Sequence, residues 1–160
     1  MQSFTVSLPI IIRPCQCQDL QGLEWFGLLS RYRNLIGETL EKHQKGQVVM
    51  LVAESNRFPI GQVWIDLEKK RADSIGILYA LRVLAPLQNA GIGSRLIGTA
   101  ENLLLERGYR TVEIGVEKDN PPAKRFYERL GYQMIGENLE EWEVQTPDGR
   151  LLKESADEWI

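Results

Sequence analysis

The sequence predicts an α/β protein in which a mixed β-sheet is flanked by helices. Two apolar, strand-like stretches at residues 47–54 and 60–67 are separated by a short turn, which predicts an antiparallel hairpin. A strand, a helix and another strand then follow across residues 74–117. Strands joined in this way are parallel under the right-handed crossover rule, so the sheet should contain both kinds of pairing.

The N-terminal third predicts one strand and two short helices. Residues 10–13 are apolar and predict the first strand. Residues 19–30 and 33–45 carry apolar side chains at irregular helical spacing, and Gly46 ends the second segment. After the hairpin, residues 74–85 are apolar and almost without charge, which predicts a strand buried on both faces in the middle of the sheet.

The clearest helix covers residues 93–108, where apolar side chains form one stripe and Gly108 is a plausible C-terminal cap. Residues 111–117 alternate and predict a strand. Asn120 followed by Pro121 predicts a helix start that continues to Gly131. Residues 133–136 and 140–145 predict strands, and a turn at residues 147–149 precedes a last strand.

Length and composition narrow the class of protein. The 160 residues predict one domain, 1–160, and no apolar run is long enough to cross a bilayer. The net charge of -3 and the lack of a long basic stretch argue against nucleic acid as a partner. Residues 1–13 make a poor signal peptide, and Cys15 and Cys17 fit neither a disulfide framework nor a metal pair, so we expect a cytoplasmic protein without a metal site.

A glycine-containing loop lies between the buried strand and the clearest helix. Residues 88–93 read Gln-Asn-Ala-Gly-Ile-Gly, and Ser94 follows with a hydroxyl. Unpaired amides and the helix dipole at such a helix start favour anions. Taken alone, the loop could equally be a flexible turn. It lacks the lysine of a Walker sequence and the pattern of a dinucleotide fold.

The loop resembles the Q/R-x-x-G-x-G/A signature of the GNAT superfamily of N-acetyltransferases. The preceding strand end is also similar to that family, with Leu81, Arg82 and Val83 followed by Pro86. A second block, residues 116–132, resembles the family's later motif: a valine, an asparagine four residues on, a tyrosine, and a terminal Leu-Gly-Tyr. The resemblance covers residues 77–132.

The resemblance implies a mostly antiparallel sheet whose central parallel strands splay apart to admit acetyl-CoA. The pantetheine arm would bond the backbone of Leu81, Arg82 and Val83, and a backbone amide near Leu81 would stabilise the oxyanion. Asn120 would contact the coenzyme. Arg95, Lys124 or Arg125 would meet its other phosphate, or equally belong to solvated helix faces. The amides expected to hold the pyrophosphate belong to Asn89, Ala90, Gly91, Ile92, Gly93 and Ser94.

The implied reaction is direct acetyl transfer to a primary amine, without a metal or a covalent enzyme intermediate. Tyr127 matches the tyrosine that protonates the departing thiolate, although its position also suits a core tyrosine. The usual glutamates are missing, because Ile77 and Gly115 stand at their positions. By strand alternation Tyr79 should face the same way as Ile77 and Leu81.

Two residues are therefore candidates for the general base. Glu113 and Glu117 should share a face with Gly115, and we select Glu113 or Tyr79 for this role. The alternative is that Glu113 is a surface glutamate and Tyr79 a packed tyrosine.

The acceptor and some alternatives stay open. Carboxylates near Trp142 and Trp159 could attract a cationic amine. Alternatively, they belong to a solvent-exposed edge strand whose charges oppose aggregation. They are Glu137, Glu140, Glu141, Glu143, Asp157 and Glu158. A polyamine, an aminoglycoside-like amine and a peptide N-terminus are all compatible. Homodimers are common in the family that the sequence resembles, so a homodimer is compatible with this chain. The rival classes are a non-catalytic acyl-CoA sensor and a partner-binding domain with an empty cleft.

Overall fold

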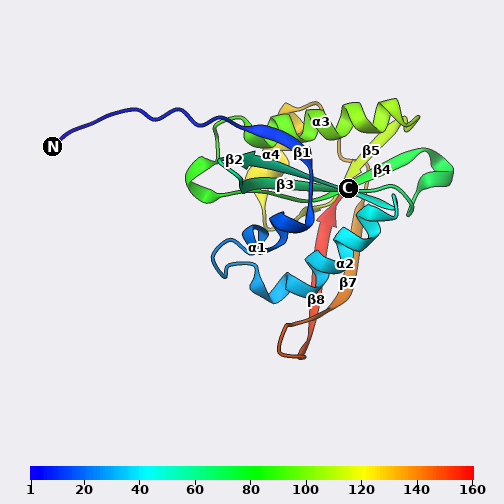
Figure 1. Cartoon of the computed structure of the whole chain (residues 1–160). Coiled ribbons are helices and arrows are strands. Elements are labelled where there is room, and N and C mark those ends of the chain that lie inside the picture. Colours follow the sequence, from blue (N-terminus) through cyan, green and yellow to red (C-terminus); the bar gives the residue numbers. More distant parts are fainter.

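The computed structural model describes residues 1–160. Eight strands and four helices follow an extended segment, residues 1–10, which points away from the rest of the molecule (Figure 1). The strands are β1 (Ile11–Pro14), β2 (Val48–Ser55), β3 (Phe58–Asp66), β4 (Ile75–Val83), β5 (Thr111–Ile114), β6 (Val116–Glu117), β7 (Glu137–Gln145) and β8 (Leu151–Trp159). The helices are α1 (Leu20–Leu23), α2 (Arg33–Gln44), α3 (Ile92–Glu106) and α4 (Pro121–Arg129). No helix is both long enough and apolar enough to span a bilayer.

The strands form two sheets instead of the single sheet predicted. The larger has the order β1-β2-β3-β4-β5, and its pairs are antiparallel except for parallel β4 and β5. The smaller has the order β6-β8-β7 and is antiparallel throughout. The strand predicted over residues 111–117 is interrupted at Gly115, where the chain passes from one sheet to the other. The predicted mixed sheet with a parallel pair is confirmed.

The parallel pair separates half-way along β4. Only Ile75–Leu78 pair with β5, and Leu78 opposite Ile114 is the last pair. Beyond this point β4 keeps its β3 neighbour up to Val83, but its other edge has no strand beside it. The prediction that residues 74–85 are buried on both faces is therefore wrong: only Gly76 and Leu78 are buried, because the strand leaves the middle of the sheet where β5 turns away.

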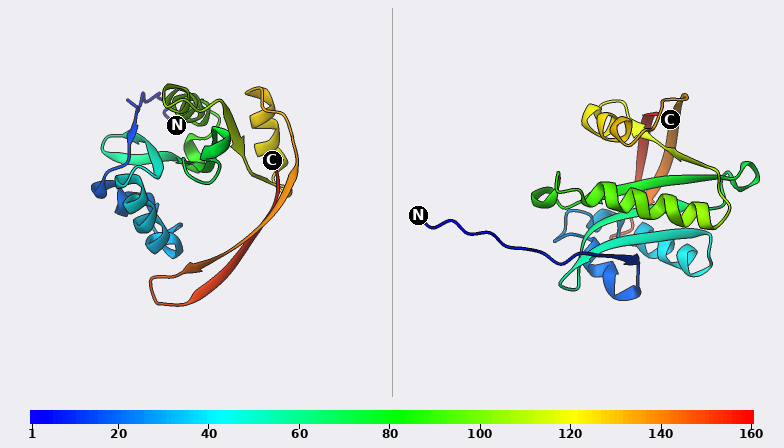
Figure 2. Two further views of the ribbon diagram at one scale, coloured as in Figure 1. Left: turned by 90° about the vertical axis from the view of Figure 1, so that its right-hand side faces the viewer. Right: turned by 90° about the horizontal axis from the view of Figure 1, so that it is seen from above.

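Helices cover both faces of the larger sheet (Figures 1 and 2). Helix α3 buries Leu96, Ile97 and Leu104 against Val63 and Ile65 of β3. On the opposite face, α2 buries Ile36 and Leu40 in a cluster that includes Trp64. Each fully buried aliphatic side chain contributes about 2 kcal/mol by leaving water. The two faces of the sheet thus fix α3 and α2 relative to the separated strands.

Helix ends follow the predicted signals in most places. The Asn120 side chain accepts a hydrogen bond from the Ala123 amide at 3.2 Å, and Pro121 is the first helical residue of α4. Gly108, with φ +86°, ends the turn after α3 and donates its amide to the Leu105 carbonyl. The predicted start of the helix at Asn120 and the predicted end at Gly108 are thus confirmed. Both caps depend only on neighbouring residues, so the local sequence is enough to predict them.

The helix predicted over residues 19–30 is mostly wrong. Only the single turn α1 is α-helical, and Trp25 and Phe26 adopt positive φ. This segment instead packs against Pro59 at the start of β3. The Trp25 indole donates to the Pro59 carbonyl at 2.8 Å, and a side-chain carbon on Gly22 would lie 2.7 Å from the Pro59 ring.

The C-terminal hairpin is longer than predicted and curved. Residues 133–136 are not a strand, because the backbone partner of Ile135 and Gly136 is the single terminal residue Ile160. Strands β7 and β8 form one hairpin that arches from α4 to the other side of the sheet (Figure 2). Near its tip, the Asn34 side chain of α2 donates to the Gln145 carbonyl at 3.2 Å and the Thr146 carbonyl at 3.4 Å.

Candidate active site

A β-bulge shapes β4 where β5 leaves it. Three steps along β4 from Tyr79 to Arg82 face two steps along β3 from Trp64 to Gln62, so β4 contains one extra residue. Ala80 takes a φ of +52°, which is unusual for a residue other than glycine. The bulge reverses the alternation of side chains after it. Tyr79 packs edge-on against Trp64 at 5.5 Å, whereas Leu81 contacts the core beneath α3.

The predicted shared orientation of Tyr79 and Leu81 is therefore wrong. Strand alternation assumes a regular ladder, and the extra residue at the bulge turns Leu81 to the opposite face. The bulge also leaves one residue of β4 outside the ladder with β3, beside the free edge of the strand. Backbone groups at this point are available to a ligand that enters between the separated strands.

A groove of about 1090 Å³ runs from the free edge of β4 to the N-termini of α3 and α4. It brings together residues that are far apart in the sequence. Its lining includes Leu81, Arg82, Val83, Asn89, Gly91, Ile92, Gly93, Ser94, Asn120 and Tyr127. Ala90 belongs to the same loop but is not among the lining residues. The predicted coenzyme residues thus share one groove, with that single exception.

The loop before α3 exposes backbone amides to this groove. Gly91 is the N-cap of α3 with φ +85°, and Asn89 also has a positive φ. The Arg95 amide donates to the Gly91 carbonyl at 3.2 Å, so the amides of the first helical turn before Arg95 remain free. The Gln88 side chain donates to the Val83 carbonyl at 3.0 Å and fastens the loop to β4. Free amides at a helix N-terminus suit a phosphate group.

Several basic side chains surround the groove. Arg125 lines it, as the resemblance implies, whereas Arg95 and Lys124 do not. Lys124 instead lies 5.3 Å from the Trp159 ring and 3.8 Å from Glu128. Arg129 and Arg31 also line the groove and were missed by sequence reasoning. Arg129 had a signal, since it is four residues after Arg125 and shares its helix face.

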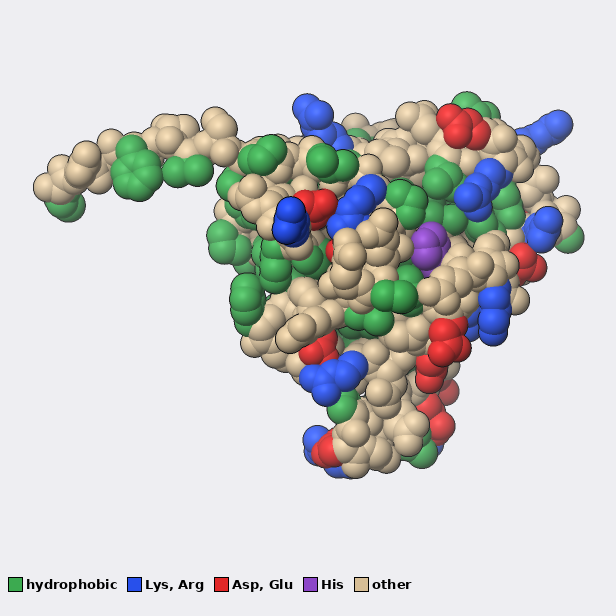
Figure 3. Space-filling model, in the orientation of Figure 1, with side chains coloured by type: hydrophobic (Ala, Val, Ile, Leu, Met, Phe, Trp, Pro, Cys, Tyr) green, Lys and Arg blue, Asp and Glu red, His purple; other side chains and the backbone are tan.

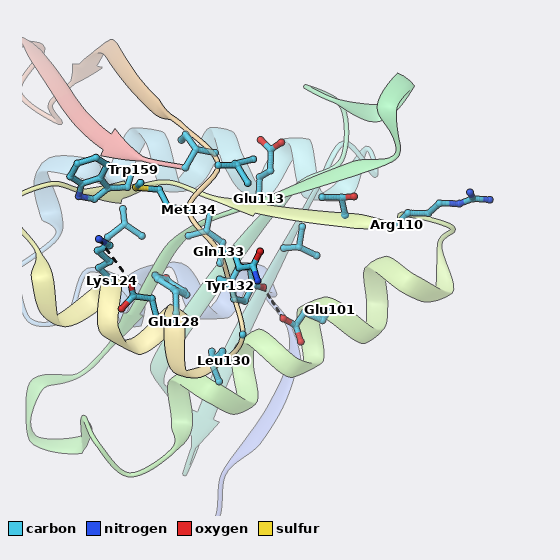
Figure 4. Close-up of a pocket in the computed structure, with 18 residues that line it drawn as sticks. Glu101, Arg110, Glu113, Lys124, Glu128, Leu130, Tyr132, Gln133, Met134 and Trp159 are labelled. Atoms are coloured by element: carbon cyan, nitrogen blue, oxygen red, sulfur yellow. Dashed lines mark hydrogen bonds and ion pairs between the residues drawn. The ribbon is translucent and has the colours of Figure 1, made fainter.

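Tyr127 of α4 lines the groove. It also lines a second cavity of about 480 Å³ between β5, α4 and the segment that follows α4 (Figure 4). Its ring makes edge-to-face contacts with Phe126 at 5.1 Å and Tyr132 at 5.8 Å. Burial raises the pKa of Tyr127 to about 12, so its hydroxyl keeps the proton at neutral pH. The residue is thus part of the core and also reaches the groove.

The two predicted base candidates are poorly suited to accept a proton. The Glu113 carboxylate is paired with Lys70 at 2.5 Å. In Figure 4, Glu113 lies on the other side of β5 from Tyr132, whose hydroxyl donates to Glu101 at 2.7 Å. Burial raises the pKa of Tyr79, with a further increase from Asp66, so its phenol is neutral. Sequence reasoning gave no base role to Glu158, which lies over Gly115.

Acidic side chains gather on the surface of the β7–β8 hairpin (Figure 3). Glu140 pairs with Lys69, and Glu137 with Lys118. Glu141 and Glu143 are exposed. Of the four glutamates around Trp142, two are thus paired with lysines and the other two are exposed.

Comparison with known proteins places the chain in a family. The family model described as the Acetyltransferase (GNAT) family matches residues 16–132. The chain belongs to this family, and the mixed sheet with its separated parallel pair is the GNAT fold. The aminoglycoside N-acetyltransferase AAC(6')-Iy, solved in complex with CoA, is similar in fold with a TM-score of 0.72 and 13% identity, over 84% of this chain and 94% of that one.

Two curated relatives are similar in sequence. Mycothiol acetyltransferase of Brachybacterium faecium is 33% identical over 92 residues, which are 57% of this chain and 28% of the relative. The 5-NmdU N-acetyltransferase of Pseudomonas phage PaMx11 is 35% identical over 72 residues, which are 45% of this chain and 49% of the relative. The match thus spans half or less of each relative's length.

Proposed function

We propose that the chain is an N-acetyltransferase that moves an acetyl group from acetyl-CoA to a primary amine, with residues 1–160 acting as one domain. The observation that carries the proposal is the separation of β4 from β5 after Leu78, which opens a groove ending at the free amides of α3. A long, thin ligand with a phosphate group at one end and a reactive group at the other fits this arrangement.

The coenzyme would lie along the groove in an extended form. Its pantetheine arm would bond the free backbone edge at Leu81, Arg82 and Val83, in place of the missing strand. Its pyrophosphate would accept hydrogen bonds from the amides of the loop before α3, from Asn89 and Ala90 to Ser94. Asn120 and Arg125 line the same groove and would contact the remaining polar groups of the coenzyme.

The reaction would then need no covalent enzyme intermediate. The neutral amine nitrogen attacks the thioester carbon, a new C–N bond forms, the nitrogen releases a proton, and the C–S bond breaks. A backbone amide at the bulge near Leu81 would stabilise the oxyanion, and Tyr127 would give its proton to the departing thiolate. Cys17 is exposed outside the groove, and burial raises the pKa of Cys15 to about 12, so neither thiol supports an acyl-enzyme route.

An amine acceptor is supported by the relatives. The phage relative is named an N-acetyltransferase, and the aminoglycoside enzyme of the same fold is also known as a complex with a bisubstrate analogue. A second candidate function is acyl-CoA sensing without transfer. The pairing of Glu113 with Lys70 favours it, since the predicted base is neutralised there.

Calorimetric titration with acetyl-CoA tests the coenzyme site. Ser94 is exposed in the first turn of α3, where a glutamate is compatible with the helix dipole but repels phosphate. We expect Ser94→Glu to weaken acetyl-CoA binding at least about tenfold, which corresponds to about 1.4 kcal/mol. The matched control is Asn102→Glu, which adds the same charge at an exposed position about 12 Å further along α3.

The same proteins distinguish the two functions. Wild-type binding that survives in Asn102→Glu and is lost in Ser94→Glu supports the loop as the phosphate site. Release of free CoA thiol with a panel of primary amines then supports transfer, whereas tight binding without thiol release supports the sensor. An absence of wild-type binding would reject both.

A further inference from the structure

The carboxylate of Glu158 occupies the point at which the parallel strands separate. Gly115 is the residue after Ile114, the last partner of β4, and it has no side chain of its own. A Cβ on Gly115 would overlap Oε2 of Glu158 and lie 2.6 Å from its Cδ. The carboxylate of β8 therefore fills the space that a side chain at residue 115 would take.

Strand pairing determines which way Glu158 faces. Glu158 pairs with Glu117, and Trp159 pairs with Val116. Trp159 lies near Lys124 of α4, so Glu158, its neighbour on the strand, points to the opposite face. Tyr127 belongs to α4 as well. Glu158 and Tyr127 thus approach the separated strands from opposite faces.

No lysine neutralises Glu158, although two lie in the vicinity. Lys69 pairs with Glu140, and Lys118 pairs with Glu137 at 2.6 Å and Asp157 at 2.9 Å. Partial burial raises the pKa of Glu158, and the charges of Glu140 and Glu117 raise it further, while Lys69 lowers it. This carboxylate has a stronger affinity for a proton than an ordinary surface glutamate.

We propose that Glu158 is the general base that removes the proton from the acceptor amine, supplied by β8 at the place where Gly115 has no side chain. The inference rests on the acetyl transfer proposed above and adds the residue that this transfer needs. It also implies a direction of approach: the acceptor enters on the Glu158 face, opposite the helix that carries Tyr127.

The proton balance of the step is complete. An amine nitrogen bonds to the acetyl carbon and passes its proton to a Glu158 carboxylate oxygen, while the C–S bond breaks and the thiolate takes the Tyr127 proton. After the products leave, Glu158 returns its proton to water and Tyr127 recovers one. An aliphatic amine with a pKa of about 10 is mostly protonated at neutral pH, so a carboxylate on the acceptor side also favours its binding, and the bound ammonium ion releases one proton to water before the neutral nitrogen attacks.

The first test is the pH profile of Glu158→Gln, which keeps the size of the side chain but cannot accept the proton. We expect kcat to fall about 100-fold, the acid limb of the kcat/KM profile to disappear, and the Kd for acetyl-CoA to change by less than about twofold. Glu154→Gln, on the same strand and face, is the matched control and should keep the wild-type profile. A Glu158→Gln enzyme with wild-type kcat and an intact acid limb would overturn the inference.

The second test moves the carboxylate instead of removing it. Glu158→Ala frees the space next to residue 115, and Gly115→Asp in that background places a carboxyl group there. We expect the double variant to be at least about tenfold faster than Glu158→Ala alone. No gain in a folded double variant would count against a base at this point. Failure of the wild type to transfer acetyl to any amine would instead reject the proposed function itself.

Discussion

Tyr127 has a structural role through its ring and a proposed chemical role through its hydroxyl group. The ring packs against Phe126 and Tyr132, whereas only the hydroxyl would reach the coenzyme sulfur. Because burial raises the pKa of Tyr127 to about 12, the protonated form is present over the whole neutral range. Rate differences between variants at neutral pH would therefore not come from ionisation of this phenol.

We predict that Tyr127→Phe lowers kcat about 100-fold while the free energy of unfolding changes by less than about 0.5 kcal/mol. The ring contacts remain and the proton donor is lost, so activity and stability should respond differently. Steady-state kinetics and urea unfolding measure the two quantities. Equal kcat in the two proteins would show that Tyr127 is only a core residue.

At the scale of the element, the bulge of β4 strains the backbone, and the packing of the residues around it must offset this free-energy cost. Ala80 is held at a φ of +52° and packs against the cluster beneath α2. A side chain branched at Cβ tolerates this backbone region poorly, whereas glycine accepts it without strain. The bulge therefore restricts which residues position 80 can hold.

We predict that Ala80→Val lowers the free energy of unfolding by about 2 kcal/mol, and that Ala80→Gly leaves it within about 1 kcal/mol of the wild type. Denaturant unfolding measures both. Ile77→Val, on the regular part of β4, is the control for the loss of one carbon, which Ala80→Gly also involves. A valine at position 80 that is tolerated as well as glycine would mean that the positive φ is absent in solution.

The elements that sequence predicted well are those defined by neighbouring residues. The stripe of α3, the Asn120 cap and the loop before α3 depend on local spacing, and all are present. The bulge at Ala80 depends on the register with β3, and the short α1 depends on its contact with Pro59. Neither partner is visible in the local sequence, which explains why the orientation of Leu81 and the helix over residues 19–30 were wrong.

The candidate site shows the same difference between features set by neighbouring residues and features set by distant ones. The groove residues were named from two sequence blocks and do line one cavity, apart from Ala90. The family pattern predicts a base on β4 or β5, but Glu113 of β5 is paired with Lys70. Glu158 reaches Gly115 only because β8 returns beside β6, and pairing across such a distance has no local signal.

At the scale of the whole molecule, the β7–β8 hairpin connects the two sides of the larger sheet. It starts near α4, contributes Glu158, and contacts α2 near its tip through Asn34 (Figure 2). The two hydrogen bonds of Asn34 connect the tip of the curved hairpin to α2. They restrain the far end of the hairpin.

We predict that Asn34→Ala increases amide hydrogen exchange at the hairpin tip, residues 145–150, while exchange in β2 and β3 is unchanged. The side chain stabilises the hairpin locally, and its loss should cost only about 1 kcal/mol of local opening free energy. Hydrogen exchange measured by mass spectrometry resolves the two regions. Unchanged exchange at the tip would show that strand pairing alone fixes the hairpin.

The break at Gly115 assigns the groove and the proposed base to different sheets. The loop before α3 and the free edge of β4 belong to one sheet and its helices, whereas Glu158 and the acidic surface belong to the other. Under the roles proposed above, mutations in the hairpin would alter the acceptor side and the base together, whereas no hairpin residue lines the groove. Under the function proposed above, exchanging this hairpin is therefore a direct route to a different acceptor preference.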